Sequence, residues 1–195
     1  MEQGEEHNPA HEVISSMEDI EAPSPKKSGR FSVLPNLAMS FTAWLPQFKP
    51  RARAIPIDAD QRQRWQDDFN SWASVQHMGF MLDLSDSHVA VLTLPAAKPH
   101  HLGGMGNKTQ IINGAIISGA FDAVLGVAGI LQFPGQRAGT VELSIKLMRP
   151  VFGPFHAIGY CLRKAATVSF VEAHVINHGK ICATATGMCA VAKAS

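Results

Sequence analysis

The feature that most constrains this chain is a long apolar segment that contains one acidic residue. From Gly114 to Leu131, only Ser118 and Asp122 have polar side chains. A helix that is apolar on every side is usually buried inside a protein. The run is short for a membrane span, and Asp122 interrupts it. We therefore predict one buried helix over about residues 113–130, around which the rest of a domain must fold.

The composition of the whole chain limits its class. Its 195 residues suffice for one domain with a core and a tail, and its formal net charge is +1. The sequence lacks the cluster of basic residues that usually marks a nucleic-acid-binding protein. The first residues are acidic, whereas a signal peptide begins with basic residues. The three cysteines form no CxxC pair, which is typical of reduced thiols in the cytosol. We predict a soluble cytoplasmic protein with no integral membrane segment, no cofactor and no bound metal.

Hydrophobic periodicity places the other elements around the long helix. Asp58 or Asp60 can cap an amphipathic helix that runs to about residue 75. Six runs are typical of strands: 79–84, 88–94, 140–148, 155–163, 167–177 and 180–192. In the third run, alternation puts Thr140 on one face with Glu142, opposite Val141. This order predicts an α+β domain whose antiparallel sheet wraps the long helix.

The N-terminal residues differ from the rest of the chain. Residues 1–30 are polar and charged, so we expect disorder there. Residues 31–57 form an apolar arm between basic flanks. This arm either packs on the domain or on a partner subunit, or it contacts a membrane surface. We therefore divide the chain into residues 1–57, the acidic tail and apolar arm, and a folded domain over residues 58–195.

Asp122 admits a structural and a functional interpretation. An isolated ionised carboxylate in an apolar helix costs several kcal/mol unless it is paired or solvated. In the structural interpretation, the side chain reaches a backbone amide or a basic group and holds two elements together, or it hydrogen-bonds Ser118 on the same helix face. Alternatively, it lines a water-accessible pocket as a base or nucleophile.

The start of the long helix offers a second chemical group. Asn113 is a good N-cap, so the N–H of Gly114 is left free for a developing oxyanion. Asp122 lies nine residues after Asn113, which is about half a turn around the helix and about 13 Å along it. The two groups of one chain therefore cannot easily face one substrate atom. Two antiparallel copies of the helix across a dimer interface could bring them together.

The order and spacing of these residues resemble the hotdog-fold acyl-CoA thioesterases of the phenylacetate-degradation (PaaI-like) group, over about residues 76–193. Asn113-Gly114-Ala115 stands where that family usually has His-Gly-Gly, with Asp122 at the family's spacing. Asn107 matches a family asparagine six residues before that histidine. The runs TVELSIKLMRP (140–150), FVEA (170–173) and ATATG (183–187) are similar to its later strands.

This resemblance implies a hotdog fold and hydrolysis of an acyl-CoA thioester by a homodimer or homotetramer. Asp122 would activate water or attack the thioester carbonyl, and the Gly114 amide would bind the oxyanion. Asn107 would orient the carbonyl or the water, and Thr140 would hydrogen-bond the water or the aspartate. Asn113 replaces the usual histidine, so any positioning role passes to a carboxamide.

The same replacements leave a second interpretation open. With Asn113 and Ala115 in place of the family's histidine and second glycine, the chain could be a non-catalytic hotdog protein that binds an acyl group or acyl-CoA. The length of the acyl chain depends on pocket depth, for which Phe80, Phe121 and Val124 are the candidate residues. The pair His100-His101 lies in a Pro- and Gly-rich loop, where we expect both imidazoles to be exposed.

Overall fold

The computed structural model describes residues 41–103 and 110–192, which all belong to one unit over residues 36–195. The elements before the sheet are α2 (Leu45–Phe48), the 3-10 turn η1 (Lys49–Arg51), α3 (Ala59–Ser71) and α4 (Ala73–Met78). Then follow β1 (Met81–Asp83), β2 (Val89–Leu94), η2 (Pro99–His101), α5 (Gly114–Ile130), β3 (Ala138–Leu147), β4 (Phe155–Lys164), β5 (Val168–Asn177) and β6 (Lys180–Val191). The prediction of disorder concerns residues 1–30, which lie outside the described part of the chain.

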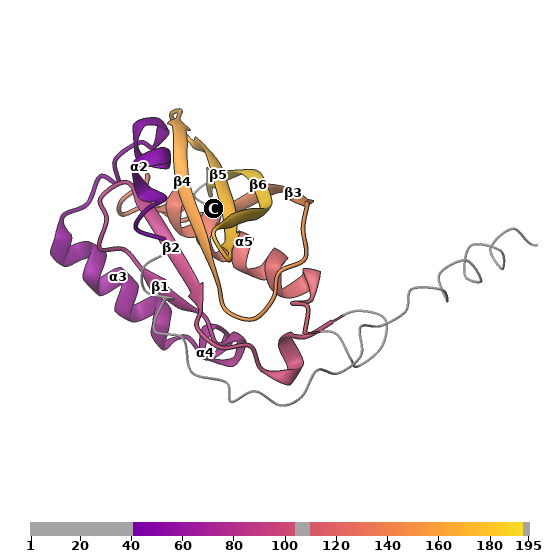
Figure 1. Cartoon of the computed structure of the whole chain (residues 1–195). Coiled ribbons are helices and arrows are strands. Elements are labelled where there is room, and N and C mark those ends of the chain that lie inside the picture. The colour runs from indigo at the N-terminus through magenta and orange to yellow at the C-terminus, as the bar shows by residue number, and fades with distance from the viewer. Residues whose placement is uncertain (1–40, 104–109, 193–195) are drawn as a thin grey trace, which may run out of the picture. The chain divides into compact units, whose positions relative to one another are not determined.

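The six strands form one antiparallel sheet in the order β1-β2-β4-β5-β6-β3. Helix α5 packs against β2, β4, β5, β6 and β3, so the sheet wraps the helix (Figure 1). The predicted α+β architecture is confirmed, with every strand at its predicted place in the order.

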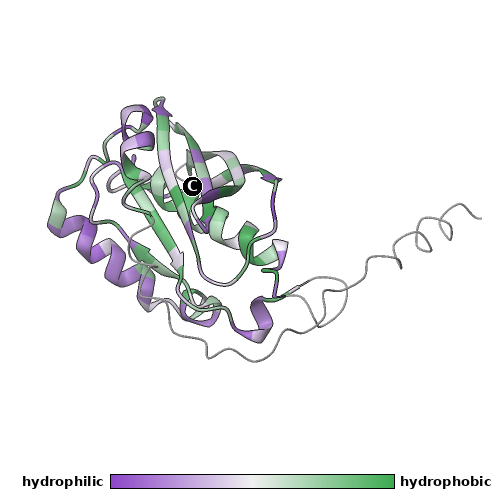
Figure 2. Ribbon diagram, in the orientation of Figure 1, coloured by the Kyte–Doolittle hydropathy of each residue, from purple (hydrophilic) through white to green (hydrophobic). Residues whose placement is uncertain are grey.

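The core lies between α5 and the sheet. Phe121, Val124 and Leu125 of α5 are fully buried there, and each such side chain contributes about 1.5–3 kcal/mol to folding. Figure 2 shows hydrophobic residues along α5 and the strands, in contrast to the hydrophilic α3. A Cβ atom at Gly159 of β4 would lie 2.8 Å from the carbonyl oxygen of Val124. The helix therefore sits against the backbone of the sheet.

The prediction of one continuous helix from residue 58 to about 75 is wrong in its extent. Asp58 caps α3 and accepts from the Gln61 N–H at 2.7 Å, but the chain becomes extended at Trp72 (ψ 131°) and starts again as α4. The Asn70 carboxamide donates to the Leu82 carbonyl at 3.0 Å and accepts from the Leu82 N–H at 2.8 Å. These bonds tie the end of α3 to β1, and the break turns Val75 into the core.

A β-bulge in β3 changes the face on which Thr140 lies. The register with β6 shifts between Thr140 and Glu142, and Val141 is 63% exposed. Thr140 consequently faces α5, as Leu143 does beyond the bulge. The prediction that Thr140 shares a face with Glu142 is therefore wrong, because a bulge inserts one residue into the alternation.

Residues 41–52 pack on the face of the sheet that is turned away from α5, whereas Ile55 joins the core around α5. Phe48 is buried and stacks on His174 of β5 (ring centroids 4.7 Å apart) and on Tyr160 of β4 (5.6 Å). Lys49 pairs with Asp86, and Arg51 pairs with Glu172 at 2.9 Å. For the described part of the arm, these contacts favour packing on the domain over a membrane contact, because Phe48, Lys49 and Arg51 already have partners in the domain.

A buried polar network lies beneath this arm. Glu172 accepts from the Tyr160 hydroxyl at 2.8 Å and lies 2.9 Å from Nε2 of His174. Burial lowers the pKa of His174, although the neighbouring carboxylate opposes this. Burial raises the pKa of Glu172, but its bonds to Tyr160 and His174 and the charge of Arg51 bring it below its usual value. The folded state therefore favours a neutral imidazole beside an ionised carboxylate.

Acid should loosen the arm. Folding lowers both pKa values. The stabilisation that each group contributes is therefore complete at pH values above its pKa in the unfolded chain. That stability is lost as the pH falls below 6.5 for His174 and then below 4.5 for Glu172. Hydrogen exchange, corrected for its intrinsic pH dependence, should become faster in acid at residues 41–53 while β4 stays protected. Arm protection that does not change with pH would contradict the role of this network.

Candidate active site

The start of α5 presents a free backbone amide, as the sequence predicts. Asn113 is the N-cap, and its Oδ1 accepts from the Ala115 N–H at 2.9 Å. Its carbonyl accepts from Ile116 at 3.0 Å and from Ile117 at 3.2 Å. Within the described residues, the N–H of Gly114 makes no hydrogen bond. The amide thus remains available to a ligand at the positive end of the helix dipole.

The backbone before α5 holds this helix start in place. The Gly103 N–H donates to the Ile111 carbonyl at 2.9 Å, and the Asn113 N–H donates to the His101 carbonyl at 2.8 Å. A Cβ atom at Gly103 would lie only 2.7 Å from Nδ2 of Asn113. A residue without a side chain is therefore needed at this position for Asn113 to reach its capping geometry.

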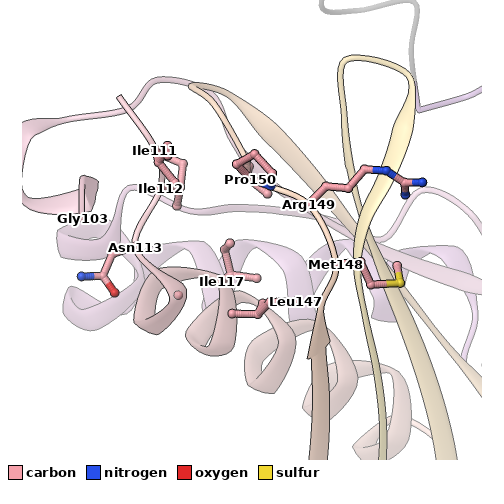
Figure 3. A pocket seen from close by; sticks show the side chains of 11 residues that line it. Gly103, Ile111, Ile112, Asn113, Ile117, Leu147, Met148, Arg149 and Pro150 are labelled. Carbon is pink, nitrogen blue, oxygen red and sulfur yellow. The ribbon is translucent and has the colours of Figure 1, made fainter. Parts of the chain in front are cut away.

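A pocket of about 450 Å³ lies beside the free amide (Figure 3). Eleven residues line it: Gly103, Ile111, Ile112, Asn113, Gly114, Ile117, Leu147, Met148, Arg149, Pro150 and Val151. These residues come from the segment before α5, the start of α5, the end of β3 and the segment that follows β3. Sequence reasoning did not identify Ile117, Met148 or Arg149 as pocket residues, although the resemblance included the segment that contains the last two.

Asp122 lies outside this pocket, on an open face of α5. The carboxylate is exposed, and no described residue makes a hydrogen bond or ion pair with it. The expectation that Ser118 bonds it is wrong, because the Ser118 hydroxyl donates to the Gly114 carbonyl at 2.8 Å. The expectation of a helix buried on every side is also wrong. The less covered face consists of small residues and the aspartate: Ala115 and Asp122 are exposed, and Ser118, Gly119 and Ala123 are half-buried.

Thr140 lies near Asp122. A Cβ atom at Gly126, one turn after Asp122, would lie 3.3 Å from Oγ1 of Thr140. Both groups also act on the buried thiol of Cys189. Burial raises the pKa of that thiol, hydrogen bonding with Thr140 lowers it, and the charge of Asp122 raises it. The structure thus brings Asp122 and Thr140 to one part of α5, and Asn113 and Gly114 to another.

Other residues singled out in the sequence have different outcomes. Asn107 lies in residues 104–109, outside the described part of the chain. The expectation that His101 is exposed is wrong: it is fully buried, and its Nδ1 accepts from the Lys98 N–H at 2.9 Å because the 3-10 turn η2 directs it inward. Phe80, Phe121 and Val124 are core residues and do not line the pocket.

The described residues contain no group of three or more histidine, cysteine, aspartate or glutamate side chains arranged to hold a metal ion. None of the described helices is long and apolar enough to cross a membrane.

At the level of sequence, the chain matches no protein-family model and no curated protein. Its structure, however, matches solved structures. A Shewanella oneidensis protein related to the thioesterase superfamily has a TM-score of 0.61 at 20% identity, covering 70% of this chain and 99% of that chain. The PaaI protein of the E. coli phenylacetic acid degradation operon has a TM-score of 0.57 at 18% identity, covering 70% and 95%. A Haemophilus influenzae thioesterase has a TM-score of 0.59 at 13% identity, covering 68% and 90%.

These matches establish that the chain has the hotdog fold. They also confirm the predicted structural resemblance to PaaI and to proteins of the thioesterase superfamily. At such low identity the likeness shows the fold, and the chemistry must be argued from the residues of this chain.

Gly103→Ala should weaken the start of α5. The added methyl group displaces the Asn113 carboxamide, and loss of an N-cap bond costs about 1 kcal/mol. Thermal unfolding should show a lower Tm, and hydrogen exchange should be faster at Ala115. Gly139→Ala is the matched control, because a Cβ atom there meets nothing within 4 Å. Equal effects of the two substitutions would show that the contact between Gly103 and Asn113 is unimportant.

Proposed function

We propose that the protein hydrolyses an acyl-CoA thioester to the free acid and CoA, at a site completed by two copies of the chain. The observation that carries this proposal is the arrangement of α5. The helix presents an unpaired Gly114 amide beside an apolar pocket, and an unpaired Asp122 carboxylate beside Thr140 farther along. An amide that binds an oxyanion and a carboxylate that acts as base or nucleophile can together catalyse thioester hydrolysis.

The two groups belong to different protomers in this proposal. Eight residues of helix separate Gly114 from Asp122, which is about 12 Å along the axis. A second α5 running antiparallel across the open face of small residues would place its Asp122 near the first Gly114. The homodimer is the smallest assembly that completes the site, and a homotetramer built from such dimers would contain the same sites.

The edge of the sheet supports this assembly. β3 is the last strand in the sheet order, and three apolar side chains at this edge are largely exposed: Val141 (63%), Leu147 (56%) and Met148 (49%). An open strand edge with exposed apolar residues is a natural surface for pairing with another chain. Because β3 contains Thr140 and borders the pocket, pairing there would place both halves of the site at the interface.

The proposed reaction uses these groups in sequence. The Gly114 N–H of one protomer stabilises the negative charge that develops on the thioester oxygen. Asp122 of the other protomer either takes a proton from the attacking water or attacks the carbonyl carbon itself. In the second case the attack gives a mixed anhydride, which water then hydrolyses to the free acid and the restored carboxylate. Thr140 hydrogen-bonds the water or the carboxylate, and Asn107 orients the carbonyl. The C–S bond breaks, a C–O bond forms, and the CoA sulfur leaves as a thiolate that takes up a proton.

One observation favours a second candidate function, the binding of acyl-CoA without turnover. The carboxamide oxygen of Asn113 is occupied by the Ala115 N–H. Asn113 therefore serves as a helix cap, and its carboxamide cannot take up and release protons as an imidazole can. If hydrolysis depends on a group with the role of the usual histidine, this chain would bind its ligand and release no product.

Asp122→Asn should lower the rate of thiol release from acyl-CoA substrates by about 10²–10⁴-fold, because the general base or nucleophile is lost. The substitution keeps the size of an exposed side chain, so the Tm should change little. Asp60→Asn, at an exposed carboxylate of α3, is the control and should keep full activity. Unchanged turnover in Asp122→Asn would refute the catalytic assignment, and no turnover in the wild type would favour the binding protein.

A mixing experiment tests the two-protomer site. Gly114→Pro removes the amide proton, while proline at the first helical position preserves the helix. Gly114→Ala keeps the amide and is its control. When equal amounts of the inactive Gly114→Pro and Asp122→Asn proteins are mixed by unfolding and refolding, about a quarter of the wild-type rate should return. Half of the dimers are then mixed, and one of the two sites in each mixed dimer is intact. No recovery would mean that both groups act within one chain.

A further inference from the structure

We propose that the pocket beside Gly114 holds the acyl chain, that it selects acyl groups without polar substituents, and that Ile117 sets its depth. This inference rests on the proposed thioester hydrolysis and names the substrate class of the same site.

The pocket has an apolar floor and a more exposed rim. Ile112, Ile117 and Val151 are buried (2%, 4% and 0% exposed) and form the floor. Leu147 and Met148 are about half exposed and form part of the rim. The buried backbone at the floor is also paired, since the Ile112 N–H donates to the Val151 carbonyl at 2.8 Å. In the part of the chain that the structure describes, a group that reaches this floor therefore meets aliphatic side chains and no side-chain hydrogen-bonding partner.

The composition of the floor decides which half of the thioester enters. The pantetheine arm of CoA contains two amides, and burial of an unpaired amide is unfavourable by about 1–3 kcal/mol. The nucleotide end contains phosphates, which require cationic partners. An alkyl chain loses no hydrogen bond on entering and gains from leaving water. With the carbonyl oxygen at the Gly114 amide, the acyl side is the half that matches the pocket.

The position of Arg149 strengthens this assignment. It is the one charged side chain among the described residues that line the pocket. Its guanidinium donates to the Ile181 carbonyl at 2.7 Å. Figure 3 shows this group directed away from Ile117 and Asn113. Among the described residues, the floor consequently offers no cation to an acyl carboxylate or to any other anionic substituent.

Ile117 is placed to limit the length of the chain. It lies three residues after Gly114, so its side chain is on the same side of α5 as the free amide. Figure 3 shows Ile117 at the centre of the pocket, between the start of α5 and Leu147. A larger side chain at this position would fill the space that the distal carbons of an acyl group occupy.

The first experiment measures kcat/KM for acetyl-, butanoyl-, hexanoyl- and octanoyl-CoA with the full-length wild-type protein. The value should rise about threefold to fourfold for each added methylene. ω-Hydroxyoctanoyl-CoA should be poorer than octanoyl-CoA by about 10–100-fold, since its hydroxyl group has no partner at the floor. Equal values along the series, or a preference for the hydroxylated chain, would overturn the proposal.

The second experiment tests Ile117 against its neighbour. Ile117→Phe should lower kcat/KM for octanoyl-CoA by about tenfold or more and leave that for acetyl-CoA within about twofold. Ile116 is also buried on α5 but does not line the pocket, so Ile116→Phe is the matched control for damage to the core. If both variants fold poorly, Ile117→Val and Ile116→Val replace them, and only Ile117→Val should shift the preference toward longer chains. The same shift in both members of a pair would overturn the role of Ile117.

A binding measurement separates this inference from the proposed reaction. S-octyl-CoA and S-ethyl-CoA are thioethers, which cannot be hydrolysed, and their Kd values can be measured by calorimetry on the wild type and on Ile117→Phe. Tighter binding of the octyl compound, lost in Ile117→Phe, would support the pocket assignment even if no thioester were hydrolysed. Equal affinities beside rapid hydrolysis would overturn the pocket assignment and leave the proposed reaction standing.

Discussion

The structure depends on how closely α5 approaches the sheet that wraps it. At Gly129 a Cβ atom would lie 2.5 Å from Sγ of Cys189, and at Gly159 it would meet the backbone of Val124. Close packing of this kind cannot relax without cost. It therefore fixes both the position and the rotation of the helix. The rotation decides which residues stay uncovered, and the uncovered face is the one that contains Asp122.

Two local structural features then place chemical groups around α5. The first is the Asn113 cap, which leaves the Gly114 amide free beside the pocket and depends on the absence of a side chain at Gly103. The second is the bulge in β3, which turns Thr140 toward the helix. Both occur where the edge strand meets α5. A second copy of the chain that covers this region would explain three features together: the open strand edge, the uncovered helix face and the half-formed site.

The features that sequence predicted well are those set by neighbours along the chain. Helix α5, its Asn113 cap and the order of the six strands follow from periodicity and capping chemistry. The distance from Gly114 to Asp122 follows from helix geometry alone. These local rules were enough to indicate the fold and to separate the two halves of the candidate site.

The errors arose where distant segments meet. The face of Thr140 depends on a register shift against β6, which alternation within β3 cannot reveal. The burial of His101 depends on contacts with distant segments, including Gly79. The pocket floor joins Ile117 to Val151, which are far apart in sequence. Pocket depth was consequently assigned to core residues such as Phe121, whose apolar character cannot distinguish a core position from a pocket lining.

A structure of the protein bound to a ketone analogue of octanoyl-CoA, in which a methylene group replaces the thioester sulfur, would test the central claim most directly. The account predicts the ketone oxygen within hydrogen-bonding distance of the Gly114 N–H of one protomer. It also predicts the Asp122 carboxylate of the other protomer beside the ketone carbon. A ligand bound away from Gly114, or one approached by the Gly114 and Asp122 of a single chain, would contradict it.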